Sequence, residues 1–125
     1  MNWLLVALGG AIGASLRYGA GLWLSKPSGI FPWSTWAINL LGCFIAGIFF
    51  ALTQKYPVLQ QETRLFVMVG ILGGFTTFSS FGLETFQLLK QSQASLALVY
   101  VGSSVLLGVM LLALGFYLFQ WIIKA

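Results

Sequence analysis

One nine-residue stretch in the middle of the chain gathers residues that could do chemistry. Positions 73–81 read GGFTTFSSF, in which three phenylalanines alternate with glycine, threonine and serine inside an otherwise apolar segment. A glycine pair beside β-branched threonines weakens a helix. Irregular backbone at membrane depth must be buried in protein or line a polar cavity, and it often marks an ion or substrate site. The stretch therefore predicts a helix break that offers carbonyl groups to an ion.

The strongly polar residues within the apolar segments are mainly hydrogen-bond donors. They are Asn39, Ser79, Ser80, Tyr100 and Ser104. Amide and hydroxyl groups donate to an anion, which a carboxylate cannot do. Phe78 and Phe81 lie three residues apart, share a helix face and can turn positive ring edges inward. The set predicts a path for a small anion, although Asn39 could equally join two helices and the rings could be ordinary packing.

The chain lacks the residues on which most enzymes depend. Its 125 residues include no histidine and only two acids, Glu62 and Glu84, with a single cysteine, Cys43. Acid–base pairs, nucleophilic triads and metal clusters therefore lack their components, and we predict that the protein is not an enzyme. Cys43 is expected to be a small packing residue. The basic residues are isolated, so no nucleic-acid partner is expected.

Four apolar segments must position these groups. The chain is 59% hydrophobic and 6% charged, whereas a soluble domain carries roughly 25% charged residues. A membrane-spanning helix needs about 20 apolar residues. The expected spans are residues 3–23, 34–52, 65–89 and 94–122. The sequence thus predicts an all-α membrane protein with four transmembrane helices, a broken third helix and a single domain over residues 1–125. The first segment lacks a basic leader region and is expected to be retained.

Small and charged residues suggest how the spans meet. Gly9 and Gly13 form a GxxxG pair, which we expect to pack within one protomer. Arg17, late in the first span, either snorkels to the interface or places positive charge at the mouth of an anion path. Glu84 is expected to form a structural ion pair with Arg17 or Lys90.

The basic residues divide evenly between the two ends of the predicted bundle. One end carries Lys55, Arg64 and Lys124, and the other carries Arg17, Lys26 and Lys90. The positive-inside rule then gives no preferred orientation. A chain without a preference can insert both ways, so two opposite copies can pair in the lipid bilayer. The count predicts an antiparallel homodimer.

The stretch at residues 73–81 resembles the signature of the Fluc (CrcB) fluoride channels, usually GGxTTFSTF, with Ser80 where threonine is usual. Other features agree in order, and the resemblance covers essentially the whole chain. They are Gly9-Gly10 before Arg17-Tyr18, Asn39-Leu40 with Gly42, Glu84 after the signature, and a glycine-rich fourth span.

This resemblance implies a dual-topology antiparallel homodimer in the inner (plasma) membrane, which exports cytoplasmic fluoride passively through two pores. It implies a structural sodium ion at the dimer centre, held by the backbone carbonyls of Gly73 and Thr76. The implied pore residues are Asn39, Phe78, Phe81, Ser80, Tyr100 and Ser104, with Arg17 in the vestibule. Gly108 departs from the family pattern, in which a hydroxyl residue is common, so the polar track is either interrupted there or completed by water or Ser103.

Two other functions fit a small four-span protein. The alternative is an exporter of the small multidrug resistance type, which relies on a glutamate in its first span. Residues 3–23 contain no acid. A helical assembly subunit without transport is the other possibility, and a polar track through three spans argues against it.

Overall fold

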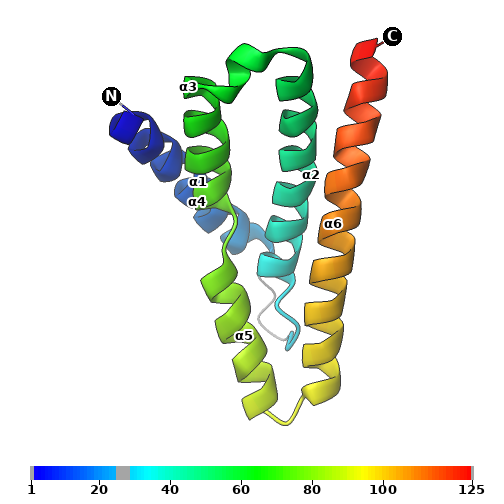
Figure 1. Cartoon of the computed structure of the whole chain (residues 1–125). Coiled ribbons are helices and arrows are strands. Elements are labelled where there is room, and N and C mark those ends of the chain that lie inside the picture. The colour runs from blue at the N-terminus through cyan, green and yellow to red at the C-terminus, as the bar shows by residue number, and fades with distance from the viewer. Residues whose placement is uncertain (1, 25–28, 125) are drawn as a thin grey trace.

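The chain forms a bundle of four long helical segments (Figure 1). The computed structural model describes residues 2–24 and 29–124. Three of the segments are the continuous helices α1 (Asn2–Leu24), α2 (Trp33–Lys55) and α6 (Ala94–Lys124). All four segments are long and apolar enough to cross a membrane. The all-α prediction is confirmed for the described residues, whereas Lys26, which entered the charge count, lies outside them.

The third segment, Glu62–Lys90, consists of several consecutive pieces. The 3₁₀ turn η1 (Pro57–Gln60) leads from α2 into α3 (Glu62–Arg64), the π-helix η2 (Leu65–Leu72) and α4 (Gly73–Phe75). The helix α5 (Phe78–Lys90) follows after two non-helical residues. Figure 1 shows the ribbon leaving its coil between α4 and α5.

The two residues between α4 and α5 have extended backbone. Thr76 has φ −85° and ψ 159°, and Thr77 has φ −150° and ψ 122°. β-branched residues favour this conformation. The Thr77 hydroxyl then accepts a hydrogen bond from the Ser80 N–H at 3.2 Å, which caps the N-terminus of α5. Thr76 therefore follows the end of α4, and Thr77 caps the start of α5.

Glycines allow two pairs of helices to approach closely. A Cβ atom at Gly9 would meet the Phe66 carbonyl, and one at Gly13 would meet the Ile71 carbonyl, so α1 packs backbone to backbone on η2. The predicted packing of this glycine pair within the protomer is confirmed. On the other side of the bundle, a Cβ at Gly47 of α2 would meet the carbonyl of Leu112 in α6. These seams set the rotation of each helix, and hence the direction of its polar side chains.

Large apolar side chains cover much of the outer surface. Leu98, Val109 and Trp121 of α6 are all more than half exposed in the single chain. Exposed apolar area of this extent marks a surface that meets lipid or another protein. Together with the four apolar segments, it identifies a multi-pass membrane protein.

Candidate functional site

The Asn39 side chain binds the extended backbone between α4 and α5 in both directions. Its Oδ1 accepts from the Thr77 N–H at 2.9 Å, and its Nδ2 donates to the Thr77 carbonyl at 3.1 Å. An amide is the side chain that offers both a donor and an acceptor in this way. Asn39 therefore joins α2 to the third segment, which was one of its two predicted roles. The other role, as a donor to an anion, stays a prediction.

The predicted sodium ligands lie where the helical hydrogen bonds are interrupted. In a continuous α-helix the Thr77 N–H would bond to the Gly73 carbonyl, and the Ser80 N–H to the Thr76 carbonyl. Here those two N–H groups donate to Asn39 Oδ1 and to the Thr77 hydroxyl. The carbonyls of Gly73 and Thr76 are thereby released from their usual partners. Backbone oxygens released in this way are suitable ligands for an alkali cation.

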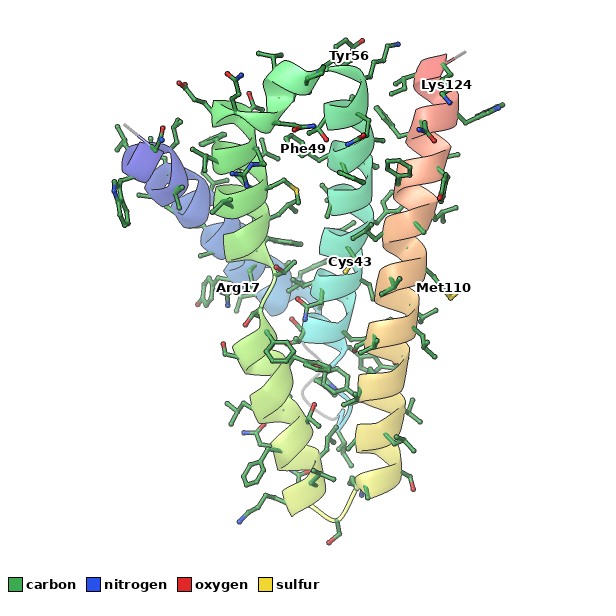
Figure 2. The ribbon with its side chains drawn as sticks, in the orientation of Figure 1. Arg17, Cys43, Phe49, Tyr56, Met110 and Lys124 are labelled. Atoms are coloured by element: carbon green, nitrogen blue, oxygen red, sulfur yellow. The ribbon has the colours of Figure 1, made fainter. Side chains whose placement is uncertain are left out.

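Arg17 reaches the same region from α1. Its Nε donates to the Gly74 carbonyl at 3.0 Å, and the side chain is partly buried. Figure 2 labels Arg17 near the level of the interruption between α4 and α5. The guanidinium thus lies at the C-terminal end of α4, where a cation is favoured by the local backbone dipoles.

Glu84 has different partners from those predicted. Its Oε2 accepts from the Thr35 hydroxyl at 3.0 Å, and its Oε1 accepts from the Tyr100 hydroxyl at 3.1 Å. Within residues 2–24 and 29–124, neither Arg17 nor Lys90 forms an ion pair with it, so that prediction is wrong. The reason is geometric: Arg17 is held at Gly74, while two hydroxyl donors from α2 and α6 surround the carboxylate.

A groove of about 420 Å³ collects most of the predicted pore residues. Its lining includes Asn39, Phe78, Phe81 and Ser104, together with Gly73 and Thr76. Ser80 and Tyr100 are absent from this lining; Tyr100 is fully buried with its phenol on Glu84. The groove thus brings the amide, one hydroxyl and both rings of the predicted pore to one surface.

The phenylalanine ring at position 78 is exposed, whereas the hydroxyl of Ser104 in the same groove is buried. Phe78 is 81% exposed, and its ring centroid lies 5.7 Å from that of Phe81. Ser104 has a buried Oγ with no hydrogen-bond partner among the described residues. Its neighbour Ser103 accepts from the Trp36 indole N–H at 3.0 Å. A buried hydroxyl without a partner is costly, so Ser104 is a site where a further ligand or water would be favoured.

Gly108 stands where the family pattern commonly has a hydroxyl residue, and it lies beside the sulfur of Cys43 rather than beside a polar group. A Cβ at Gly108 would lie 3.3 Å from the Cys43 sulfur, and Figure 2 labels Cys43 between α2 and α6. Cys43 also lines the groove. The polar lining supplied by α6 to the groove therefore consists of Ser104, and the wall beyond it towards Leu112 is apolar.

Two residues that hold the site together carried little signal in the sequence. Thr35 is buried and binds Glu84, and Trp36 binds Ser103. A single hydroxyl or indole near the start of an apolar span is ordinary, because such groups usually bond to backbone or lie at the membrane interface. Their partners come from other helices, so spacing along α2 could not reveal them.

Comparisons with known proteins agree with the resemblance seen in the sequence. A family model described as CrcB-like protein, Camphor Resistance (CrcB), matches residues 4–116. The chain is 49% identical over 118 residues to the fluoride-specific ion channel FluC of Thermus thermophilus, and the matched stretch covers 94% of this chain and 92% of that protein. It is 44% identical over 121 residues to the protein of the same name from Chloroflexus aurantiacus, covering 96% of each. The chain therefore belongs to the CrcB family.

Proposed function

We propose that this protein is a fluoride-selective ion channel that exports cytoplasmic fluoride passively. The observation that carries the proposal is the groove in which Asn39, Ser104 and the Phe78–Phe81 pair meet, in a chain whose relatives are named fluoride-specific ion channels. Membership of a channel family also makes it a non-enzymatic transporter. The multidrug exporter alternative loses support, because the first span has no acid and the relatives are channels.

The groove chemistry suits a small, strongly hydrated anion. Such an ion enters a narrow path only if donors replace its water, and it leaves only if no single site holds it too tightly. The Ser104 hydroxyl has no partner in the described chain and is available as a donor. The rings of Phe78 and Phe81 add weak attraction through their edges. Ser80 and Tyr100 remain proposed pore residues next to this groove, and Arg17 remains proposed for the vestibule.

We further propose that two copies assemble as an antiparallel homodimer with a broken third helix at its centre and two pores. The even division of basic residues supports insertion in both orientations. The extended backbone at Thr76 and Thr77 supports the broken helix. The groove is open along one side of the protomer, which supports the proposal that a second copy forms the remaining wall. The proposed location is the inner (plasma) membrane.

The carbonyls of Gly73 and Thr76 are proposed to hold a structural sodium ion where two copies meet. Both carbonyls have lost their helical N–H partners to Asn39 and Thr77. Sodium prefers several oxygen ligands, so one chain supplies too few and an opposite copy would complete the set. The ion would fix the two interrupted helices relative to each other and would take no part in transport steps.

Fluoride efflux from proteoliposomes containing the purified protein tests the main proposal. Efflux with fluoride, and much slower efflux with chloride, is the expected result; no fluoride efflux, or equal rates for both ions, would overturn it. Crosslinking that captures only parallel pairs would overturn the antiparallel dimer. For sodium, the dimer should dissociate more readily when potassium replaces sodium, and an unchanged dimer would remove the ion from the proposal.

A further inference from the structure

A continuous series of aromatic contacts leads from the groove towards the start of α2. The ring of Phe78 packs on Phe81, and the ring of Phe81 lies 5.0 Å from that of Tyr100. On its other side Tyr100 meets Phe31, with the ring centroids 5.4 Å apart and an interplanar angle of 85°. Tyr100 is 0% exposed. Its ring is therefore held between a candidate pore residue and a residue that precedes α2.

Phe31 also borders a second cavity, which is smaller and more polar than the groove. This cavity has a volume of about 220 Å³, and its wall includes Ser34, Glu84, Gln87 and Gln91. Phe78 and Phe81 line the groove at one end of the ring series, and Phe31 lines the polar cavity at the other. The aromatic series thus lies between a polar cavity and the candidate pore.

The backbone and its neighbours hold Phe31 in place. Proline at position 32 restricts the preceding residue to extended conformations. The Phe31 carbonyl accepts a hydrogen bond from the Trp33 N–H at 2.9 Å. The centroid of the Phe31 ring lies 4.5 Å from that of Trp33 and 6.0 Å from that of Trp36. Trp36 is itself tied to α6 through Ser103. The Phe31 ring therefore has little freedom to move away from Tyr100.

We infer that Phe31 is a positioning residue for the ion path, and that its ring holds Tyr100 against Phe81 and closes the inner end of the polar cavity. The inference rests on the proposed channel function, in which Tyr100 and Phe81 border the path. Without the ring, Tyr100 loses the edge-to-face contact that orients it against Phe81 and towards its 3.1 Å hydrogen bond to Glu84. An aliphatic side chain of similar volume fills the space but makes no edge-to-face contact.

The test measures fluoride efflux from proteoliposomes for the wild type, Phe31→Leu, Phe31→Met and Phe31→Tyr. The two aliphatic variants should conduct roughly two- to tenfold more slowly, the range that one lost aromatic pair gives. Phe31→Tyr keeps the ring and should stay within about twofold of the wild type. Phe50→Leu is the matched control, because Phe50 also pairs with an α6 ring, that of Phe116 at 5.2 Å, and lines neither cavity. Its flux should equal that of the wild type.

Three results would overturn the inference. The aliphatic variants could conduct as fast as the wild type, or Phe31→Tyr could be as slow as Phe31→Leu. Recovery of a folded dimer for Phe31→Tyr but for neither aliphatic variant would assign the ring to folding alone. Phe31→Met carries the test if only Phe31→Leu fails to fold. Failure of the proposed function is a separate observation, since the wild type itself would then release no fluoride.

Discussion

Asn39 of α2 and Thr77, an extended residue between α4 and α5, are joined by two hydrogen bonds that use both backbone polar groups of the threonine, at 2.9 and 3.1 Å. Because Thr77 is extended, its N–H and carbonyl have no partners within the helix, and Asn39 supplies a partner to each. It also withdraws the Thr77 N–H from the Gly73 carbonyl. One side chain thereby stabilises the interruption and exposes an oxygen that a continuous helix would hide.

Replacing Asn39 with alanine should lower the free energy of unfolding by about 1–3 kcal/mol. The reason is that the Thr77 N–H and carbonyl would both lose their partner in a partly buried site. Chemical denaturation in detergent micelles measures the change. Cys43→Ala is the control, since Cys43 lines the same groove one turn later. If Asn39→Ala lowered the free energy of unfolding no more than Cys43→Ala, the stabilising role of the two Asn39–Thr77 hydrogen bonds would be contradicted.

Gly13→Ala should destabilise the protein by about 1–3 kcal/mol, because the new methyl group would meet the Ile71 carbonyl across the α1–η2 seam. Gly10→Ala offers a neighbouring comparison, since a Cβ there has no atom within 4 Å. It should be neutral or stabilising by up to about 1 kcal/mol, as alanine favours a helix over glycine. Thermal unfolding of the two variants side by side measures the difference. Equal effects would argue against the close backbone contact.

Ser104→Ala should reduce fluoride efflux while leaving stability almost unchanged. Its buried hydroxyl has no partner among residues 2–24 and 29–124, so its removal breaks no bond there. Ser103→Ala should behave in the opposite way and cost about 0.6 kcal/mol, because it removes the acceptor of the Trp36 indole N–H. Efflux and unfolding measured on both variants separate the two roles. Full efflux in Ser104→Ala would remove this hydroxyl from the path.

Phe78→Ile and Phe81→Ile should each cut fluoride efflux by about tenfold, the effect of roughly 1.4 kcal/mol on a barrier, while the dimer persists. Phe78 is largely exposed in the protomer, so its replacement should hardly change protomer stability. Phe86→Ile is the matched control on the same helix, where the side chain is exposed and lies outside the groove lining. Gel filtration reports the dimer and an ion-selective electrode reports the efflux. Undiminished efflux in both pore variants would remove the rings from the path.

Glu84→Ala should cost about 1–3 kcal/mol of stability, because the Thr35 and Tyr100 hydroxyls would lose their acceptor in a partly buried site. The other acid of the chain supplies the control. Glu62 is exposed, and Glu62→Ala should change stability by less than about 0.5 kcal/mol. Denaturant titrations of both variants test the prediction. Equal, small losses would mean that the two hydroxyls find other acceptors.

Local features of the chain could be predicted from the sequence alone. Apolar length predicts four spans, and the threonine pair at residues 76–77 coincides with the place where the structure has extended backbone, whereas the glycine pair at residues 73–74 is helical. The signature at residues 73–81 identified the family that the comparisons confirm. Such features depend on neighbouring residues, because helix propensity, capping and hydrophobic transfer act over one or two turns.

The pairing of distant polar groups was decided only by tertiary structure. Arg17 binds Gly74, 57 residues away, and not Glu84, whose carboxylate lies between Thr35 and Tyr100. Periodicity tells which residues share a face of one helix, but not which face of another helix lies opposite. That choice follows from the rotation imposed where Gly13 and Gly47 let two backbones touch. The spans and the family therefore follow from the sequence, whereas packing between helices sets which donors meet which acceptors around the groove.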